Sequence, residues 1–513
     1  MSLPGDPVRK RDRFLLPLVF SSGMTTLAVE MSASRLLAPY FGTSLVIWAN
    51  LIGLMMIYLA AGYYLGGRLA DRFPHRRVLY QITAWAGFAI GLVPFLAHPI
   101  LRFSLRGYVD YSVDIFIGSL VGLLALFLIP VVLLGCVSPF AIRLQTASVV
   151  STGHTAGGIY ALSTLGSILG TFLPVLVFIP FFGTRNSFLI FSLTLLSLSL
   201  VGLSLVDRRC AWWYIPLPLI ILALGLLPRG LIKATEGMIY EEESPYNYIQ
   251  VLKEGDDILL TLNEGQAFHS FYNPHRVLSY GVWDYFLLVP YFNADYSPQE
   301  VKSLLLIGLA GGTVTKEYSQ IYAPILMEGV EIDPSIIEVG RRFFAMNEPN
   351  LKAIAQDGRY FLSRTEKKYD VIAIDAYRQP YIPFYLTTYE FFALAREHLT
   401  PRGVAAINVA RTKSDFRLVD ALASTMAAVF PDVYIIDAHV PNSIVVGTSQ
   451  DTELEGFYEN VARLTDPHLR QVAEMAEGGV RRYEGRGPVF TDDRASVEHL
   501  INLIALRFML EGE

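Results

Sequence analysis

The chain has 513 residues, of which 52% are hydrophobic and only 17% are charged. Its mean hydropathy of +0.40 is far from that of a soluble protein, so we expect part of it to lie in a lipid bilayer. The net charge of -6, with no basic run beyond the extreme N-terminus, argues against a nucleic-acid-binding protein. Two cysteines, Cys136 and Cys210, both in or beside apolar segments, provide neither a disulfide framework nor a cysteine metal site.

The N-terminal half contains seven apolar segments that are long enough to be considered as membrane spans. Six of them predict membrane-spanning helices, whereas the last is short and interrupted by Pro216, Pro218 and Pro228. Glu30 lies inside the first segment and no small-residue cleavage site precedes the second, so the first segment does not read as a cleaved signal peptide. The seven segments are residues 14–33, 46–66, 78–98, 115–135, 158–180, 187–206 and 212–228.

A change of composition follows the last apolar segment. Residues 229–243 are a linker in which the hydrophobic runs stop and three consecutive glutamates begin. The alternating segments 248–252 and 258–262, with a turn at 263–265, predict a short β-hairpin. We therefore expect three domains: a polytopic membrane domain at 1–232, a linker with a small β domain at 233–290, and an α/β domain at 291–513.

The α/β domain begins with an apolar run and a glycine-rich turn, Leu304 to Val314. An apolar run without polar alternation predicts a strand covered on both faces, and the glycines allow the backbone to approach a ligand closely. A second apolar run ends at Glu331, 23 positions after Gly308. An acidic residue at that separation is typical of a carboxylate that binds the hydroxyl pair of a ribose.

Two further carboxylates follow predicted elements of the same domain. Asp357 comes after a helical segment, and Asp375 ends the buried strand that starts at Tyr369. Ligands of open α/β sheets bind outside the carboxyl ends of the strands, so Gly308, Glu331, Asp357 and Asp375 should converge on one crevice. Residues 404–409, 433–436 and 443–446 predict late strands, the last two antiparallel, and residues 452–479 predict helix.

The order of these residues resembles that of spermidine synthases and of the wider class I methyltransferase-like superfamily. The resemblance spans about residues 240–450 and implies a Rossmann-like fold with a helix at 277–290. It also implies that Glu331 holds the ribose, Asp357 the adenine amino group, and Asp375 the reacting end of S-adenosylmethionine or its decarboxylated form. The cofactor-binding residues expected from the resemblance are Gln266, Gly308, Gly311, Gly312, Glu331, Ile332, Asp357, Gly358 and Asp375.

The N-terminal half resembles the membrane half of multispanning bacterial proteins fused to a spermidine-synthase-like domain. Residues 30–42 and 158–167 carry this resemblance. We therefore identify the chain as similar to membrane-fused spermidine synthase-like proteins, with a transmembrane helical bundle before the β and α/β domains. The small β domain builds oligomer contacts in that family, which implies a homodimer here.

The loop after Asp375 departs from the family pattern. Spermidine synthases carry a second aspartate three residues on, which serves as general base, whereas this chain has Arg378 there. The acid pair that the family uses near its diamine is also missing, and we expect the nearest acid, Asp284, to be a solvated helix residue. The candidate catalytic residues are Asp375, Tyr377 and Arg378, and no metal site is expected.

A related departure concerns the form of the sulfonium. The family's glycine turn carries an aspartate that pairs with the ammonium left by decarboxylation, and Gly311 stands at that position. Relative to the family pattern, the predicted site therefore lacks two negative charges, and Arg378 adds one positive charge. We therefore hypothesise that intact S-adenosylmethionine is preferred to the decarboxylated form.

The resemblance implies transfer of an aminopropyl-type three-carbon group to a polyamine or another amine, with release of methylthioadenosine. Methyl transfer or elimination of the sulfonium is the main enzymatic alternative, and a transporter or sensor with a non-catalytic nucleoside-binding domain is the other.

The expected location is the cell membrane. Arginine and lysine residues in the short loops place the N-terminus in the cytoplasm. Seven spans would then deliver the C-terminal half to the outside, where an adenosyl sulfonium is not expected. We therefore expect residues 212–228 to lie in the interface or to be re-entrant, or an eighth crossing to exist, with the C-terminal domain cytoplasmic.

Overall fold

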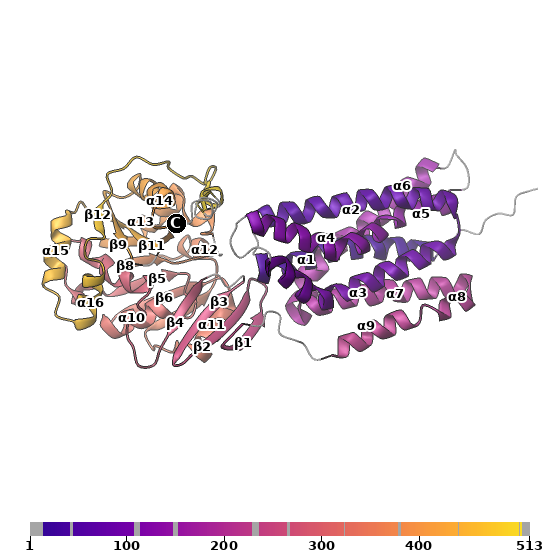
Figure 1. The fold of residues 1–513 in the computed structure, drawn as a ribbon. Helices are drawn as coiled ribbons and strands as arrows, with labels where there is room; N and C mark the ends of the chain where they lie inside the picture. Colours follow the sequence, from indigo (N-terminus) through magenta and orange to yellow (C-terminus); the bar gives the residue numbers. More distant parts are fainter. Residues whose placement is uncertain are drawn as a thin grey trace, which may run out of the picture. The chain divides into compact units, whose positions relative to one another are not determined.

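The computed structural model divides the chain into two compact units, Met1–Lys233 and Ala234–Glu513, which are described separately (Figure 1). The first is helical, and the second consists of a small antiparallel sheet and a larger mixed sheet with helices. The fold class predicted from the sequence is therefore confirmed. The structure describes residues 14–41, 45–106, 113–146, 152–227, 235–263, 267–322, 324–377, 381–439, 441–501 and 503–504.

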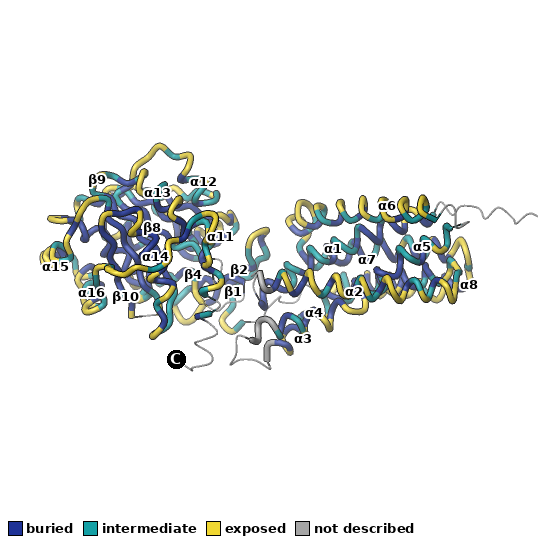
Figure 2. The backbone as a smooth tube through the Cα atoms, turned by 90° about the horizontal axis from the view of Figure 1, so that it is seen from above, coloured by how far each residue is buried: buried dark blue, intermediate teal, exposed yellow. Residues whose placement is uncertain are grey.

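The helices of the first unit are long and apolar, and many of their outward-facing side chains are apolar as well. Met56 and Ile129, for example, are 66% and 65% exposed, and Figure 2 shows exposed positions recurring along the outer helices. An exposed apolar surface of this kind is compatible with contact to lipid. The helices are α1 Leu15–Phe41, α2 Leu45–Arg72, α3 Arg76–Arg106, α4 Val113–Gly135, α5 Val137–Gln145, α6 Thr152–Leu173, α7 Ile179–Val206, α8 Arg208–Trp212 and α9 Pro216–Leu226.

Among the described residues, six helical stretches are long and apolar enough to cross a membrane. One of them, Thr152–Val206, has 55 residues and contains two of the spans predicted from the sequence. Its helical path is broken at Gly183, where φ is +81° and ψ is 165°. A straight helix of that length would be about 80 Å long, more than twice the hydrocarbon thickness of a bilayer.

The contacts of α6 and α7 show that the chain turns back at this break. Gly170 of α6 lies against Met24 in the middle of α1, and Ser187 of α7 hydrogen-bonds Ser32 further along α1 at 3.0 Å. Towards its end, α7 is back beside the start of α1, through contacts of Gly202 with Tyr80 and of Tyr80 with Phe14. The stretch therefore makes two antiparallel passes.

The short segment α8–α9 lies lengthwise on the bundle. Arg77 at the start of α3 pairs with Asp207, which immediately precedes α8, at 2.8 Å. At the other end, Arg185 near the start of α7 donates to the carbonyl of Leu224 in α9 at 2.9 Å. The segment thus runs antiparallel to α7 along the bundle as a seventh pass, which differs from the interfacial or re-entrant position expected from the cytoplasmic location of the cofactor. Pro216 and Pro218 are in the first turn of α9, where a missing N–H costs no helical hydrogen bond.

Glycines bring α1 and α6 into close contact. A Cβ added at Gly166 would lie 2.0 Å from the carbonyl oxygen of Phe20, and one at Gly170 would lie 1.9 Å from that of Met24. Small residues four apart form the kind of surface on which membrane helices approach each other most closely. Gly166 and Gly170 therefore form a helix-packing surface.

We predict that Gly166→Ala destabilises the bundle, because the new methyl group would overlap the backbone of α1. The expected cost is about 1–3 kcal/mol, seen as a lower Tm of the detergent-purified protein. Gly157→Ala is the matched control, since a Cβ there meets no atom within 4 Å. The control should leave Tm unchanged or raise it slightly through helix propensity. Equal effects of the two substitutions would contradict this assignment.

The second unit starts with a four-stranded antiparallel sheet in the order β1-β2-β3-β4. Its strands are β1 Met238–Glu243, β2 Tyr248–Glu254, β3 Asp257–Leu262 and β4 Phe268–Tyr272. The two segments predicted as a hairpin are β2 and β3, which pair in register from Ile249 with Leu262. Apolar residues of this sheet pack on α11 (Pro334–Phe343), so the small sheet is anchored to the larger domain.

The larger sheet has eight strands in the order β12-β10-β11-β9-β8-β5-β6-β7. The five strands from β9 to β7 are parallel, whereas β10, β11 and β12 are antiparallel, as predicted for the late strands. The order reverses between β5 and β8, which is where open α/β sheets bind ligands. The bounds are β5 Ser303–Ile307, β6 Leu326–Glu331, β7 Leu351–Ala355, β8 Tyr369–Ile374, β9 Leu399–Ala410, β10 Asp432–Asp437, β11 Asn442–Thr448 and β12 Val480–Arg482.

Helices cover both faces of this sheet, which explains why its central strands carry uninterrupted apolar runs. One face packs against α10 (Thr313–Ile321), α15 (Leu454–Ala462) and α16 (Pro467–Met475). The other face packs against α12 (Gly358–Leu362), α13 (Tyr389–Glu397) and α14 (Arg417–Ala427).

The segment expected as a helix at 277–290 is instead a 3₁₀ helix, η3, at Val282–Phe292. Every residue of η3 except Trp283 is buried. It packs in the same hydrophobic cluster as α10, so its conformation follows from burial on all sides rather than from an amphipathic pattern.

Candidate functional site

The glycine-rich turn after β5 has the backbone of a ligand-binding turn. Gly308 and Gly312 have φ values of +92° and +88°, and Ala310 between them has +48°. A Cβ at Gly308 would lie 2.4 Å from the carbonyl oxygen of Asp375, so only glycine allows the two strand ends to approach. The turn therefore lies directly at the point where the strand order reverses.

The Glu331 carboxylate ends β6 beside this turn and is only 8% exposed. One oxygen accepts a hydrogen bond from the Ala310 amide at 3.0 Å, and the other accepts from the Asp333 amide at 3.2 Å. Burial raises the pKa of Glu331 to about 7, with the backbone hydrogen bonds opposing this effect in part. No ion pair involves this carboxylate among the described residues, so it is suited to accept from neutral hydroxyl groups.

The Asp375 carboxylate follows β8 and is held from two sides. The Trp283 indole donates to Oδ2 at 2.9 Å, and the Asn408 amide donates to Oδ1 at 2.8 Å. Asn442 donates in turn to the side-chain oxygen of Asn408 at 2.9 Å, which fixes the orientation of that amide. Burial raises the pKa of Asp375 to about 7, and the two hydrogen bonds lower it only partly. The carboxylate is thus rigidly oriented and has no cationic partner among the described residues.

Asp357 lies beyond β7 and caps α12. Its Oδ1 accepts from the Tyr360 amide and its Oδ2 from the Tyr385 hydroxyl, both at 2.9 Å. The following Gly358 packs on β5, since a Cβ there would lie 2.3 Å from Ile307 Cγ2. Glu331, Asp357 and Asp375 therefore all follow the carboxyl ends of parallel strands, as expected from the sequence.

The other predicted residues have different surroundings. The hydroxyl of Tyr377 donates to the Asn408 carbonyl and accepts from the Ala410 amide, both at 2.9 Å, which ties the loop to β9. Ile332 is 39% exposed beside Glu331. A Cβ at Gly311 would lie 2.9 Å from that of Ser270, so the turn packs tightly on β4 there. Gln266 and Arg378 lie outside the described residues.

One residue that the sequence analysis missed connects the small sheet to the site. Asp333 is fully buried and caps α11 by accepting from the Ser335 amide. It also accepts from the Ser244 hydroxyl at 2.5 Å and from the Asn247 amide at 3.0 Å. The segment 244–247 therefore anchors the end of β6. The only available signal was the helix-capping position of an aspartate before Pro334.

The C-terminal segment 491–493 contacts the domain near Asp357. Asp492 forms a bidentate ion pair with Arg359, at 2.6 and 2.7 Å, one turn after Asp357. Thr491 forms a turn with Arg494. Thr491 therefore does not cap the following helical turn, because that turn begins only at residue 497.

Asp284 is fully buried, which corrects its interpretation as a solvated helix residue. Its carboxylate accepts from the amides of Ser279 and Tyr280 at 2.9 Å and from the Ser279 hydroxyl. These bonds fix the loop that precedes Trp283, including Tyr280 at a φ of +58°. Asp284 therefore positions the residue that hydrogen-bonds Asp375.

A second buried carboxyl group lies against Asp284. Glu317 of α10 is 1% exposed, and among the described residues neither of its oxygens has a hydrogen-bond donor. Burial and the neighbouring Asp284 charge raise the pKa of Glu317 well above its usual value. The protonated form of Glu317 is therefore favoured, and in that form its hydroxyl could donate to Asp284. This pair links the helix after the glycine turn to the Trp283 loop.

We predict opposite outcomes for two similar substitutions in this pair. Glu317→Gln should change the free energy of unfolding by less than about 1 kcal/mol, because an amide also donates to Asp284. Asp284→Asn should cost about 3 kcal/mol, since its amide nitrogen would face N–H and O–H donors in a buried site. Thermal unfolding of the purified full chain measures both. Equal destabilisation would contradict the assignment of the proton to Glu317.

The fold and site define a class of protein. A glycine turn and three carboxylates at the carboxyl ends of parallel strands, around the point of strand reversal, form a Rossmann-like domain of the methyltransferase-like type.

Comparison with known proteins narrows this class. The family model "Spermine/spermidine synthase domain" matches residues 289–448. A probable polyamine aminopropyl transferase of Bifidobacterium longum is 34% identical over 208 residues, covering 40% of this chain and 45% of the relative. A polyamine aminopropyltransferase of Oceanobacillus iheyensis is 23% identical over 480 residues, covering 81% of this chain and 88% of the relative.

Solved structures of similar proteins include a probable spermidine synthase from Corynebacterium glutamicum. It is 20% identical, with a TM-score of 0.38, and the match covers 49% of this chain and 98% of that one. The chain spans less than half the length of the Bifidobacterium relative. Residues 289–448 of the second unit are thus similar to a spermine/spermidine synthase domain, and a region of long apolar helices precedes them.

Proposed function

We propose that the second unit transfers an aminopropyl-type three-carbon group from an adenosyl sulfonium to an amine and releases methylthioadenosine. The observation that carries the proposal is the set of three carboxylates around the glycine turn, two of them with raised pKa values and without a cationic partner among the described residues. The family match and the names of the two relatives support the same reaction class.

The three carboxylates and their surroundings fit such a ligand. Glu331 is placed to accept from two ribose hydroxyls, with the exposed Ile332 beside it offering an apolar surface to the base. Asp357 can accept from the adenine amino group while it keeps its bonds to Tyr360 and Tyr385, because each carboxylate oxygen has two acceptor sites. Asp375 would face the positively charged reacting end. The ligand is a co-substrate that supplies an activated carbon.

In the proposed step, the amine nitrogen forms a bond to the carbon, the carbon–sulfur bond breaks, and its electron pair goes to sulfur. The amine must lose one proton in the process. A carboxylate with a pKa near 7, held rigidly by Trp283 and Asn408, is suited to accept that proton, which assigns this role to Asp375. Fixed alignment and exclusion of water supply the rest of the catalysis.

We also propose that the intact sulfonium is accepted in preference to the decarboxylated form. Gly311 packs against Ser270 and Phe344, so the turn holds no carboxylate at the position where an acid would bind an ammonium. Three-carbon transfer from the intact form would deliver an aminocarboxypropyl group, and elimination would compete with it. The family match points to the decarboxylated form, so a direct comparison of the two is required.

The decisive experiment incubates the purified full chain with each sulfonium and an amine and identifies the products by mass spectrometry. Methylthioadenosine is expected, and Asp375→Asn should reduce kcat at least about 100-fold with a smaller effect on binding. Asp451→Asn, an exposed acid, is the matched control. Adenosylhomocysteine as product would establish methyl transfer instead, and binding without any product would establish a sensor. Tighter binding of the decarboxylated form would overturn the preference for the intact one.

We predict that affinity for methylthioadenosine rises with pH. Glu331 has a raised pKa of about 7 and must be ionised to accept from the ribose, so binding should weaken about tenfold between pH 8 and pH 6. Glu331→Gln should weaken binding and remove that dependence, whereas the exposed Glu338→Gln should do neither. The ligand-free fold follows the opposite trend, because a carboxyl with a raised pKa loses its stabilising contribution as pH rises through about 7. Calorimetry at both pH values measures the affinities, and a pH-independent wild type would refute the ribose role.

We further propose that the second unit is cytoplasmic, because the sulfonium is available there. The positive-inside rule with seven passes gives the opposite orientation, so direct labelling is needed. A cysteine introduced as Asp451→Cys should resist a membrane-impermeant maleimide in intact cells and react after permeabilisation. Arg208→Cys should react in intact cells, since the single pass α8–α9 separates the start of α8 from the second unit. Labelling of Asp451→Cys in intact cells would refute the cytoplasmic location.

A further inference from the structure

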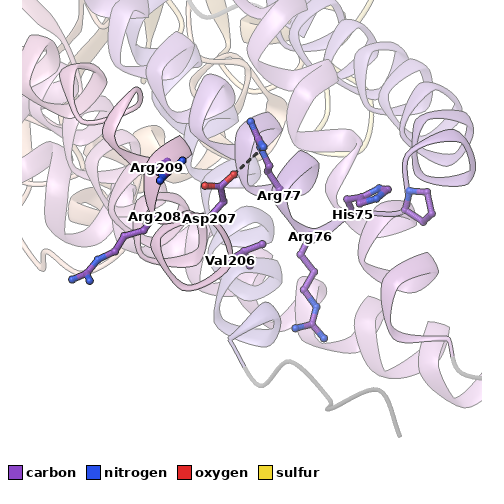
Figure 3. Close-up of a pocket in the computed structure, with 8 residues that line it drawn as sticks. His75, Arg76, Arg77, Val206, Asp207, Arg208 and Arg209 are labelled. Atoms are coloured by element: carbon purple, nitrogen blue, oxygen red, sulfur yellow. Dashed lines mark hydrogen bonds and ion pairs between the residues drawn. The ribbon is translucent and has the colours of Figure 1, made fainter. Parts of the chain in front are cut away.

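An open cavity lies at the end of the bundle where α2 meets α3 and α7 meets α8. Its volume is about 620 Å³, and it is lined by Pro74 to Arg77 and by Val206 to Arg209 (Figure 3). Nothing in the proposed reaction uses these residues, which belong to the first unit. The lining contains four arginines and a single aspartate, so the cavity is strongly positive.

Asp207, the one acid in the lining, is held by two contacts within the bundle. Asp207 pairs with Arg77 through Oδ2 at 2.8 Å, and its Oδ1 accepts from the Cys210 amide at 3.0 Å. Figure 3 shows Arg77 and Asp207 pointing toward each other, while Arg76 and Arg208 extend away from this pair. Within the described part of the chain, the exposed Arg208 and Arg209 have no ion-pair partner. Their charge is therefore available to an anion.

Among the described residues, Arg143, unlike Arg208 and Arg209, has an ion-pair partner. Arg143 of α5 is paired with Asp71 of α2 at 3.0 Å. Arg143 therefore does not add unpaired positive charge at this position.

Exposed apolar side chains lie close in sequence to the residues that line this cavity. Trp212 and Trp213, which follow Arg209 within five residues, are 72% and 84% exposed, and Leu205 is 69% exposed. Tryptophans with this exposure are typical of the level of the lipid headgroups, where the ring lies in the interface. A ligand with a phosphate and acyl chains would satisfy both surfaces, whereas a soluble phosphate would leave the apolar one uncovered.

We propose that this cavity binds the phosphate of an anionic glycerophospholipid, with Arg208 and Arg209 as its main ligands and the chains lying along Trp212 and Trp213. Guanidinium groups bind phosphate oxygens in a bidentate manner, and basic cavities between membrane helices are suited to such headgroups. The assignment holds for either orientation of the bundle, because the cavity reaches the interface of whichever leaflet it faces.

The test uses the full chain in nanodiscs or detergent, with phosphatidylglycerol, phosphatidylcholine and free glycerol phosphate as probes. Native mass spectrometry should show retained phosphatidylglycerol in preference to phosphatidylcholine, weakened by 0.5 M salt. Arg208→Gln and Arg209→Gln should each lower that affinity about fivefold. Arg102→Gln, an exposed arginine near the other end of α3, is the matched control and should leave it unchanged.

Three outcomes would overturn the proposal. Equal retention of the two lipids would show that the headgroup charge is not recognised. An equal loss in Arg102→Gln would show that binding depends on overall charge and not on this cavity. Free glycerol phosphate that binds as tightly as the lipid would assign the cavity to a soluble phosphate compound. The Tm of each variant, measured in parallel, shows whether the bundle remains folded, and a lost affinity at unchanged Tm supports the lipid site.

Discussion

The second unit depends on an anionic side chain that is removed from water without a cationic partner among the described residues. Asp375 is oriented by Trp283 on one side and by Asn408 on the other, and these neutral donors do not offset its desolvation fully. A carboxylate in that state gains free energy when a positive charge binds beside it. The same physical condition that destabilises the ligand-free domain at high pH would thus favour binding of a cation such as the proposed sulfonium.

The surrounding structure keeps Asp375 in place through parts of the chain that are far apart in sequence. The Trp283 loop is fixed by Asp284, and Asp284 neighbours Glu317 of α10, whose pKa is raised by burial and by the Asp284 charge. Since α10 starts at the glycine turn, movement of the turn and movement of Trp283 are coupled through a buried pair. A buried pair of carboxyl groups with one proton is stable only when its other hydrogen bonds are complete, and the three donors at Asp284 fulfil that condition.

Different interactions hold the first unit together, because its outer surface is apolar and small and polar residues make contacts between its helices. Backbones approach at Gly166 and Gly170, and serine pairs such as Ser32 with Ser187 bridge neighbouring helices. In a lipid environment close packing and interhelical hydrogen bonds replace the hydrophobic effect as the driving force for helix association. Some charged groups lie towards the helix ends, where Arg77 pairs with Asp207 and Arg185 binds backbone carbonyls, whereas Glu30 and Arg35 lie within α1.

The sequence by itself determined the two-part architecture, because uninterrupted apolar segments and glycine-rich turns are local signals. It also identified Glu331, Asp357 and Asp375 as the acids that follow parallel strands, since strand ends can be read from hydrophobic runs. It did not reveal Trp283 and Asn408 as partners of Asp375, and it assigned Asp284 to solvent. These contacts join residues between 33 and 92 positions apart, and no local pattern encodes such pairs. Only the tertiary structure decided that η3 is buried on all sides and that Thr152–Val206 folds back at Gly183. It also decided that α8–α9 runs along α7. Each of these features depends on packing between segments that are distant in the sequence.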